Sequence, residues 1–115
     1  MINFTNRFHG HGSLRFVYKN GQSVRSHFIN MKYITNPSRK YSRISVVVSK
    51  KIIKSAVKRN RIRRRIYEII RPLIDDFNNI NDIVFIVLSS EILTMPSNEL
   101  SNNIKDLLKE ANVIN

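Results

Sequence analysis

The residues of this chain best suited to a specific chemistry are the lysines and arginines between positions 50 and 65. Nine of the 20 basic residues lie in this segment, and no Asp or Glu accompanies them. Lys and Arg neutralise phosphate groups and release their counterions. The planar Arg guanidinium also binds two phosphate oxygens at once or stacks on a base. The segment therefore predicts contact with a polyanion.

The charge of the whole chain is divided in the same way. Residues 1–67 contain 17 Lys and Arg and no acid, whereas residues 68–115 contain three basic and all eight acidic residues, so +17 and −5 give the net charge of +12. A field of one sign destabilises a domain by self-repulsion unless a polyanion neutralises it. Interspersed charges would serve solubility better. We expect a nucleic acid, with an anionic membrane surface as the minor alternative.

Length and composition exclude several classes of protein. The 115 residues, 42% of them hydrophobic, are enough for one core, so we expect a single domain over 1–115 with a mobile segment at 1–12. No Cys is present, which excludes disulfides, Cys-based zinc sites and a thiol nucleophile. The apolar runs are too short to span a bilayer, and the first residues lack a signal-peptide core. These features predict a cytoplasmic protein.

The basic segment must be positioned by a small set of helices and strands. A short helix capped by Ser13 is expected to run through Tyr18 and to stop at Asn20-Gly21, with the left-handed conformation that Gly permits. Strands are expected at 28–35, 43–49 and 82–88, the first two paired with each other. A last helix follows the start signal at 94–97 and has one apolar face: Leu100, Ile104, Leu107, Leu108 and Ala111.

A long amphipathic helix is expected within the segment from Lys50 to Asp76. At ~100° per residue, six large apolar side chains fall on one stripe: Ile62, Ile66, Ile69, Ile70, Leu73 and Phe77. Five basic side chains fall on the other side: Lys54, Lys58, Arg61, Arg64 and Arg65. Arg59 and Arg63 instead point toward the apolar side. Pro72 is expected to kink or restart the helix near Arg71.

Two motifs closely resemble the protein subunit of bacterial ribonuclease P. The first is Ser49-Lys50-Lys51, Ala56-Val57, Arg59-Asn60-Arg61-Ile62-Arg63-Arg64 and Glu68, which matches the family signature in spacing as well as composition. The second is Asn6-Arg7 followed by Leu14, Val17-Tyr18-Lys19, Gly21 and Ser23-Val24. The resemblance spans about residues 6–111.

Some positions depart from the family pattern. Leu14 stands where the family has the first aromatic of a pair, with Phe16 two residues further on. Ser45 and Val47 stand where Gly and Ser are common, and Tyr67 replaces an Arg. None of these departures removes the central Arg-Asn-Arg group.

The resemblance implies a two-layer α/β (α+β) sandwich with a small mixed sheet of about four strands, in the order α-β-β-(β)-α-β-α. It also implies a left-handed β-α-β crossover, against the general right-handed rule. In this family the catalytic RNA performs the hydrolysis with Mg²⁺, and the protein supplies neither a catalytic residue nor a metal site of its own. The implied partners are the ribonuclease P RNA and precursor tRNA, with no membrane and no obligate protein partner.

The resemblance also assigns residues to two surfaces. Ten residues would face the catalytic RNA: Lys50, Lys51, Lys54, Lys58, Arg59, Asn60, Arg61, Arg63, Arg64 and Arg65. Five would form a cleft on which the unpaired bases of the 5′ leader of precursor tRNA stack: Leu14, Phe16, Tyr18, Phe28 and Val47. The expected result is endonucleolytic removal of the leader.

Other interpretations remain beside this one. A structural RNA-binding protein of ribosomal type would share the charge and the fold but would have no leader cleft. A basic DNA-binding module would prefer duplex DNA, and no helix-turn-helix pattern supports it. His9-Gly10-His11 offers two potential metal ligands, but without Cys or a nearby carboxylate the motif has too few ligands for a good metal site.

Overall fold

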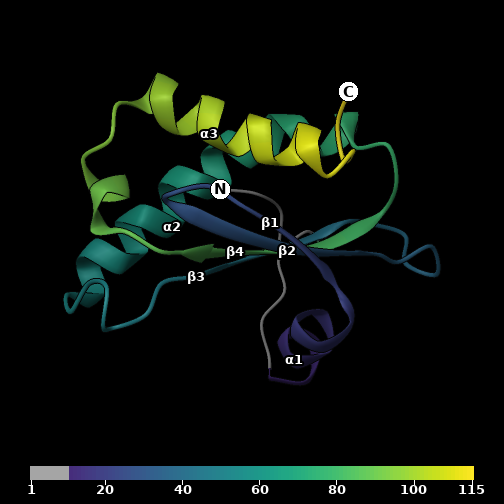
Figure 1. Cartoon of the computed structure of the whole chain (residues 1–115), viewed down its shortest axis with the longest axis horizontal. Coiled ribbons are helices and arrows are strands. Elements are labelled where there is room, and N and C mark those ends of the chain that lie inside the picture. The colour runs from purple at the N-terminus through teal and green to yellow at the C-terminus, as the bar shows by residue number, and fades with distance from the viewer. Residues whose placement is uncertain (1–10) are drawn as a thin grey trace.

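The molecule is built around one four-stranded sheet with helices on both faces. The computed structural model describes residues 11–115, and its strand order is β1-β2-β4-β3. Two long helices, α2 and α3, cover one face, and of the described elements only the short α1 lies on the other (Figure 1). The elements are α1 (His11–Asn20), β1 (Gln22–Arg25), β2 (Ile29–Thr35), β3 (Arg43–Val47), α2 (Ala56–Ile70), the 3-10 helix η2 (Arg71–Asp76), β4 (Asn81–Val87), the 3-10 helix η3 (Ser90–Leu93) and α3 (Ser97–Glu110).

The main core lies between the sheet and the two long helices. Alternate residues of the strands face it, among them Ile44 and Phe85. The predicted stripe of α2 meets them: Ile62, Ile66 and Ile70 are fully buried, and Ile69, Leu73 and Phe77 pack at the edge. The predicted face of α3 is confirmed in the same way, with four buried side chains: Leu100, Ile104, Leu107 and Leu108.

The opposite face of the sheet is covered only in part. Val17 of α1 packs on Val84 of β4, and the surrounding apolar side chains are partly exposed: Leu14, Ile34, Val47 and Ile86. Within residues 11–115, α1 is the one helix on this face, and ten residues are too few to cover four strands. The described part of the fold therefore has a closed layer above the sheet and an apolar surface beside α1 that no other described element covers.

The expected pairing of strand 28–35 with strand 43–49, which are β2 and β3, is wrong. β2 pairs in antiparallel fashion with β4, and β3 pairs with β4 in parallel. The run Asn81–Val87 is buried along nearly its whole length, which suits the centre of a sheet better than its edge. The expected order α-β-β-(β)-α-β-α is confirmed, and the further strand is β1, which precedes the others and pairs with β2.

The connection from β3 through α2 to β4 is left-handed. Both strands run toward the end of the molecule at which α2 begins, β3 lies behind β4, and α2 crosses above them (Figure 1). The resemblance predicted this hand, whereas the general rule predicts the opposite one. The arrangement brings the ends of β3 and β4, the start of α2 and η3 to one end of the molecule.

Three details of the helices differ from the expectations. The first helix begins at His11 and not after Ser13. Gly21 ends it without a left-handed φ; a Cβ atom there would lie 2.6 Å from the Val17 carbonyl oxygen and 2.8 Å from that of Tyr33, so only Gly fits. The segment before Ala56, including Lys54, is a loop and not part of α2.

The prediction for Pro72 is confirmed. The α-helix ends at Ile70, and the chain continues as a 3-10 helix in which Pro72 occupies the first turn. Pro lacks the backbone N–H and clashes with the preceding turn, so it cannot continue an α-helix without distortion.

A buried ion pair joins the two parallel strands. Arg43 donates two hydrogen bonds to the carboxylate of Asp82, at 2.9 and 2.8 Å, and Asn36 donates a third at 3.1 Å. Burial alone would raise the pKa of Asp82, but the bonds from Arg43 and Asn36 and the positive charge of Arg43 outweigh it and hold this pKa below its usual value. The pair fixes the register of β3 against β4, where Arg43 lies opposite Asp82.

Candidate nucleic-acid interface

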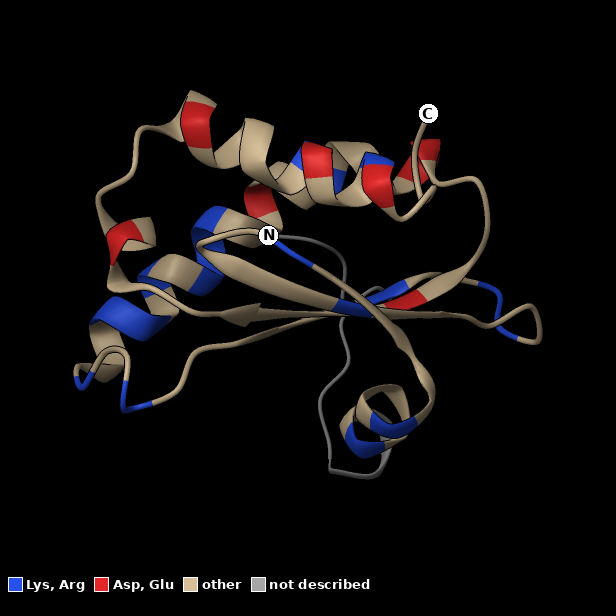
Figure 2. Ribbon diagram, in the orientation of Figure 1, with Lys and Arg blue, Asp and Glu red and all other residues tan. Residues whose placement is uncertain are grey.

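The basic residues gather at the end of the molecule where α2 begins. Figure 2 shows Lys and Arg in the loop before α2, along α2, on α1 and in the loop between β2 and β3, whereas the acidic residues lie on α3 and η3, toward the end of α2 and in η2, and on β4. Ser55 starts the helix: its hydroxyl accepts a hydrogen bond from the backbone N–H of Lys58 at 3.3 Å. The loop thus presents Lys50, Lys51 and Lys54 beside the first turns of α2, all three exposed.

Arg59 and Arg63 lie on the inner flanks of α2, as predicted. Both are partly buried. Arg59 donates to the backbone oxygens of Ile53, at 3.0 Å, and Lys54, at 2.8 Å, so it holds the lysine-bearing loop against the helix. Arg63 donates to the side-chain oxygen of Asn60 at 2.8 Å. Part of the hydrogen-bonding capacity of Arg59 and Arg63 is therefore used inside the protein.

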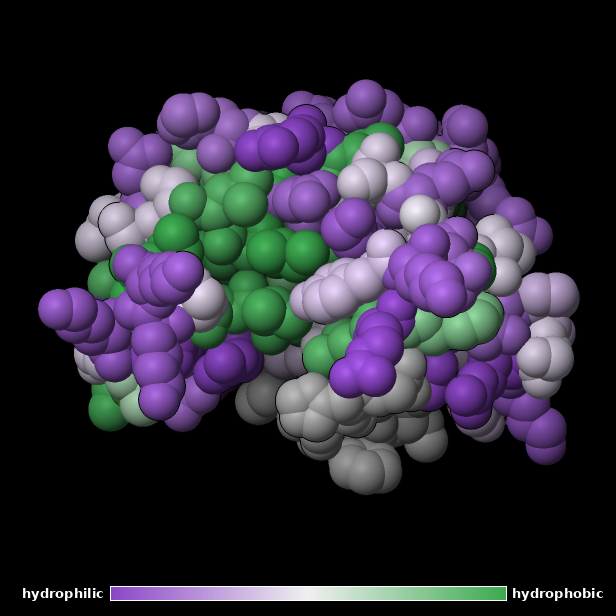
Figure 3. Space-filling model, turned by 60° about the horizontal axis from the view of Figure 1, so that its bottom comes forward, coloured by the Kyte–Doolittle hydropathy of each residue, from purple (hydrophilic) through white to green (hydrophobic). Residues whose placement is uncertain are grey.

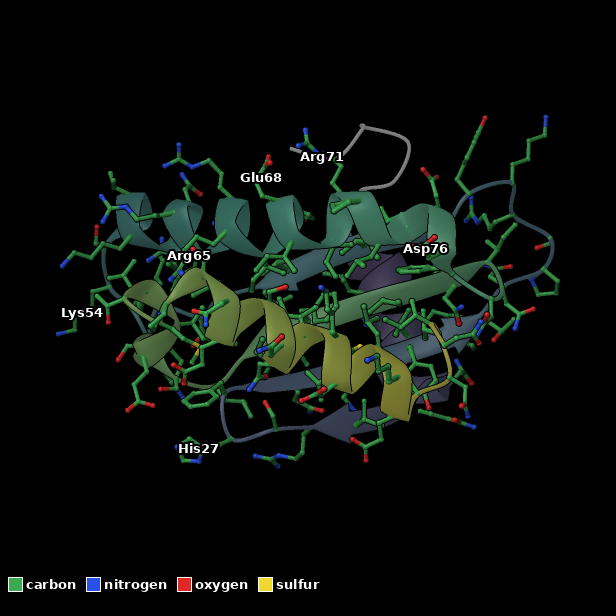
Figure 4. The ribbon with its side chains drawn as sticks, turned by 90° about the horizontal axis from the view of Figure 1, so that it is seen from above. His27, Lys54, Arg65, Glu68, Arg71 and Asp76 are labelled. Carbon is green, nitrogen blue, oxygen red and sulfur yellow. The ribbon has the colours of Figure 1, made fainter. Side chains whose placement is uncertain are left out.

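Arg65 has a different environment from the one predicted. Its guanidinium is partly buried between α2 and η3 and donates to the backbone oxygens of Ile92, Leu93 and Met95. These carbonyls belong to η3 and to the turn that leads into α3. Arg65 was predicted to face an RNA, but in the structure it joins α2 to the start of α3 (Figure 4).

Arg61 and Arg64 are the arginines of α2 whose guanidinium groups remain available to bind a ligand. Both are exposed, and neither has a hydrogen-bond or ion-pair partner among residues 11–115. They line a groove of about 480 Å³ between α2 and the start of α3, together with Arg65, Glu68, Ile69 and Ser97. Glu68 pairs with Arg71, 3.2 Å away, one turn along α2 (Figure 4).

A second hollow lies between α2, α1 and the edge strand β3. Its volume is about 270 Å³, and it brings together Leu14 and Val47, which were predicted to share a cleft. Arg63 and Tyr67 of α2 form another wall, and the remaining lining comes from Ser45, Val46 and Val48. Seen from the side on which α1 lies, the molecule exposes hydrophobic side chains with hydrophilic ones around them (Figure 3). The hollow combines apolar walls with a guanidinium.

The three other predicted cleft residues are not in this hollow. Tyr18 lies on α1 beside Leu14 at helical spacing and is 40% exposed, and partial burial raises its pKa. Phe16, 54% exposed, points to another side of α1, ~160° from Leu14. Phe28 packs against the main core, on the opposite face of the sheet. The structure therefore brings Leu14, Val47 and the neighbouring Tyr18 together and separates Phe16 and Phe28 from them.

Four residues that line the hollow were not predicted as site residues: Ser45, Val46, Val48 and Tyr67. Two of them, Tyr67 and Ser45, carry polar groups. Tyr67 follows Arg63 by four positions, so both lie on one side of α2. Ser45 precedes Val47 by two positions, so both project from the same face of β3. Ser45 is 4% exposed, and its hydroxyl has no side-chain hydrogen bond within the part of the chain that the structure describes. Helical and strand periodicity would have identified both residues once Arg63 and Val47 were chosen.

The structure contains no evident protein metal site within its described range. No group of three His, Asp or Glu side chains that could hold a metal ion occurs in residues 11–115. His9-Gly10-His11, the motif weighed for metal binding, and the predicted mobile segment 1–12 fall wholly or mostly outside the described residues. No described helix is long and apolar enough to cross a membrane.

Comparison with known proteins decides the family. A family model described as Ribonuclease P matches residues 3–112. The chain belongs to the ribonuclease P protein family. The ribonuclease P protein component of a Pseudanabaena species is 31% identical over 99% of this chain and 97% of its own length. That of Clostridioides difficile is 39% identical over 86% of this chain and 85% of its own length.

Solved ribonuclease P proteins share the fold. The protein of Staphylococcus aureus superposes with a TM-score of 0.84 at 27% identity, covering 96% of this chain and 98% of that one. The protein of Thermotoga maritima gives a TM-score of 0.76 at 26% identity, covering 84% and 89%. The mixed α+β fold with an open four-stranded sheet is therefore that of ribonuclease P proteins.

Proposed function

We propose that this ribonuclease P protein binds the catalytic RNA with one side of α2 and the 5′ leader of precursor tRNA with the other. The observation that carries the proposal is the division of the arginines of α2. Arg61 and Arg64 point outward and are unpaired among the described residues, whereas Arg63 lines the hollow beside α1 and β3. One helix thus presents cations on two sides, one for the catalytic RNA and one for the leader of precursor tRNA.

The outward surface suits the folded catalytic RNA. It consists of the exposed lysines of the loop and of α2 with Asn60, Arg61 and Arg64. Contacts of this kind with phosphate oxygens carry little sequence information but position the partner. They also make affinity strongly dependent on salt. Arg59 and Arg65 support the surface from inside, because they hold the loop and η3 to α2.

The hollow and the open sheet face suit a single-stranded leader. Unpaired bases stack on apolar and aromatic side chains without strong sequence preference, and cations beside them bind the backbone. Leu14, Val47 and Tyr67 of the hollow offer such contacts beside Arg63, and Tyr18 extends them from its place next to Leu14 on α1. A mature tRNA lacks the leader, so these contacts would favour the precursor.

In this proposal the catalytic RNA performs the hydrolysis with Mg²⁺ in the cytoplasm, and the protein contributes affinity and positioning. The enzyme is therefore an endoribonuclease in which this chain has no catalytic residue. Its effect on cleavage arises from tighter binding of precursor tRNA.

Replacement of Arg64 tests the outward surface. We expect Arg64→Ala to weaken binding to the cognate catalytic RNA and to reduce the slope of log affinity against log salt concentration by about one, because one phosphate contact is lost. Lys109→Ala is the matched control, since Lys109 is an exposed cation at the far end of α3. Filter binding over a range of salt concentrations measures both. Equal effects of the two substitutions would contradict the assignment of Arg64 to the surface that binds the catalytic RNA.

A further inference from the structure

A third hollow lies at the basic end of the molecule and shares no residue with the other two. It has a volume of about 350 Å³ and lies between the loop before α2, the first turn of α2 and η3. Its lining consists of Ile52, Ile53, Lys54, Ser55, Lys58, Ser90 and Leu93. We call it the loop–η3 hollow. Its volume is at the lower end of the range of about 300–1,000 Å³ that small-ligand sites occupy.

Both walls of the loop–η3 hollow are fastened to the same helix. Arg59 donates to the carbonyl oxygens of Ile53 and Lys54 and so holds the loop. Arg65 donates to the carbonyl oxygens of Ile92 and Leu93 and so holds η3. A hollow whose walls are fixed before binding needs little ordering when a ligand enters.

The lining combines three chemical characters. Ile53 is buried, and Ile52 and Leu93 are partly buried against the core, which gives an apolar floor. Ser55 and Ser90 add hydroxyls; that of Ser55 accepts the N–H of Lys58 and keeps its own hydrogen to donate. Lys54 and Lys58 are exposed at the rim, and neither has a carboxylate partner among the described residues.

We propose that the loop–η3 hollow binds one unpaired base of the catalytic RNA. The apolar floor would contact the face of the base, the serine hydroxyls its polar edge, and the two lysines the phosphates on either side. Proteins recognise RNA most specifically at such unstacked bases, because the edges of paired bases in an A-form helix are hard to reach. The proposal rests on the proposed binding of the catalytic RNA and adds a base contact to its phosphate contacts.

Filling the hollow without changing charge tests the proposal. Ser90 suits this because it is exposed and because Ser89, not Ser90, caps η3 by accepting the N–H of Glu91 at 3.1 Å. We expect Ser90→Phe to weaken binding to the cognate catalytic RNA about fivefold or more, the effect of losing one stacked base, with an unchanged salt slope. Asn102→Phe, on the exposed side of α3, is the control for a new surface aromatic residue.

Chemical probing of unpaired bases in the catalytic RNA supplies a second measurement. The wild-type protein should protect one unpaired base that Ser90→Phe leaves reactive. Ile52→Trp fills the hollow from the opposite wall and should reproduce both results, which guards against a folding defect in one variant.

Two outcomes would overturn the inference in different ways. If Ser90→Phe and Ile52→Trp bind the RNA as tightly as Asn102→Phe and give the same protection pattern, the hollow takes no base and the RNA contacts are those of the phosphates alone. If the wild-type protein itself does not bind the catalytic RNA, the proposed function fails, and the base contact fails with it.

Discussion

At the scale of single residues, arginines that look alike in the sequence have different environments. Arg61 and Arg64 are exposed, Arg63 lines a hollow, and Arg59 and Arg65 donate to backbone carbonyls. An exposed guanidinium can bind phosphate, whereas one held by carbonyls stabilises the fold. The difference depends on which neighbouring segment each side chain meets.

Tyr18 and Phe16 form a natural pair for testing the leader surface. Tyr18 lies beside Leu14, and Phe16 lies on another side of the same helix. We expect Tyr18→Ala to weaken binding of leader-bearing precursor to the holoenzyme by about 1–3 kcal/mol, the value of one stacked base, and to leave binding of mature tRNA unchanged. Phe16→Ala should change neither.

The measurement is the dissociation constant of the assembled holoenzyme for the two RNAs. Equal losses for precursor and mature tRNA with Tyr18→Ala would show that this side chain supports the fold and does not contact the leader. A loss of precursor affinity with Phe16→Ala would place the leader on the other side of α1.

Asp82 should give the stability of the protein a dependence on acidic pH. Its pKa is held below the usual value of about 3.9, so its stabilising effect is complete above that pH and is lost as the pH falls through the lowered value. Asp82→Asn should cost about 3 kcal/mol near neutral pH, because it removes the buried carboxylate charge to which Arg43 donates two hydrogen bonds. Urea unfolding between pH 2.5 and 7 should show a smaller pH dependence for the variant. Parallel curves for the two proteins would contradict this role of Asp82.

At the scale of elements, the local sequence pattern was enough to predict the buried faces of the helices and the place where α2 ends. The stripe of α2 from Ile62 to Ile70, the apolar face of α3 and the break at Pro72 follow from spacing and from the chemistry of Pro. The four-residue β1 has no comparable apolar pattern, because most of its residues are exposed. Its strand conformation depends on pairing with β2.

Contacts between distant segments could not be predicted in this way. β4 lies in the centre of the sheet, between β2 and β3. This strand order depends on how deeply each strand can be buried relative to all the others, which the local pattern of one strand does not show. The environment of Arg65 likewise depends on η3, an element that no sequence pattern predicted. Of the candidate site, the basic surface was predicted from composition, whereas the grouping of Arg63 with Tyr67 and Ser45 needed the structure.

Arg65 should matter for stability more than for RNA contact. Arg65→Ala removes the donor to three carbonyl oxygens, and we expect a loss of about 2 kcal/mol in the free energy of unfolding. Arg61→Ala is the matched control on the same helix, and its free energy of unfolding should stay within about 0.5 kcal/mol of the wild type, because Arg61 is exposed and unpaired within the described residues. Urea denaturation measures both. A stable Arg65→Ala variant with weakened RNA binding would contradict the role of Arg65 in joining α2 to η3.

At the scale of the whole molecule, charge and shape are organised around one end. The left-handed connection places the loop of lysines, the start of α2 and η3 together, and the acidic residues of α3 lie on the layer above (Figure 2). The cations there repel one another, so binding a polyanion should stabilise the protein as a whole. The open sheet face begins beside the same helix, which allows two RNA strands to approach α2 from different sides.

Cleavage of precursor tRNA by the cognate catalytic RNA at low Mg²⁺, with and without this protein, tests the central claim most directly. The substrates should differ only in whether they carry a 5′ leader long enough to reach the sheet face. Two surfaces on α2 predict that the protein stimulates cleavage and that the stimulation grows with the leader. Tight, salt-dependent binding to the RNA without leader-dependent stimulation would contradict the claim and would favour a purely structural RNA-binding protein.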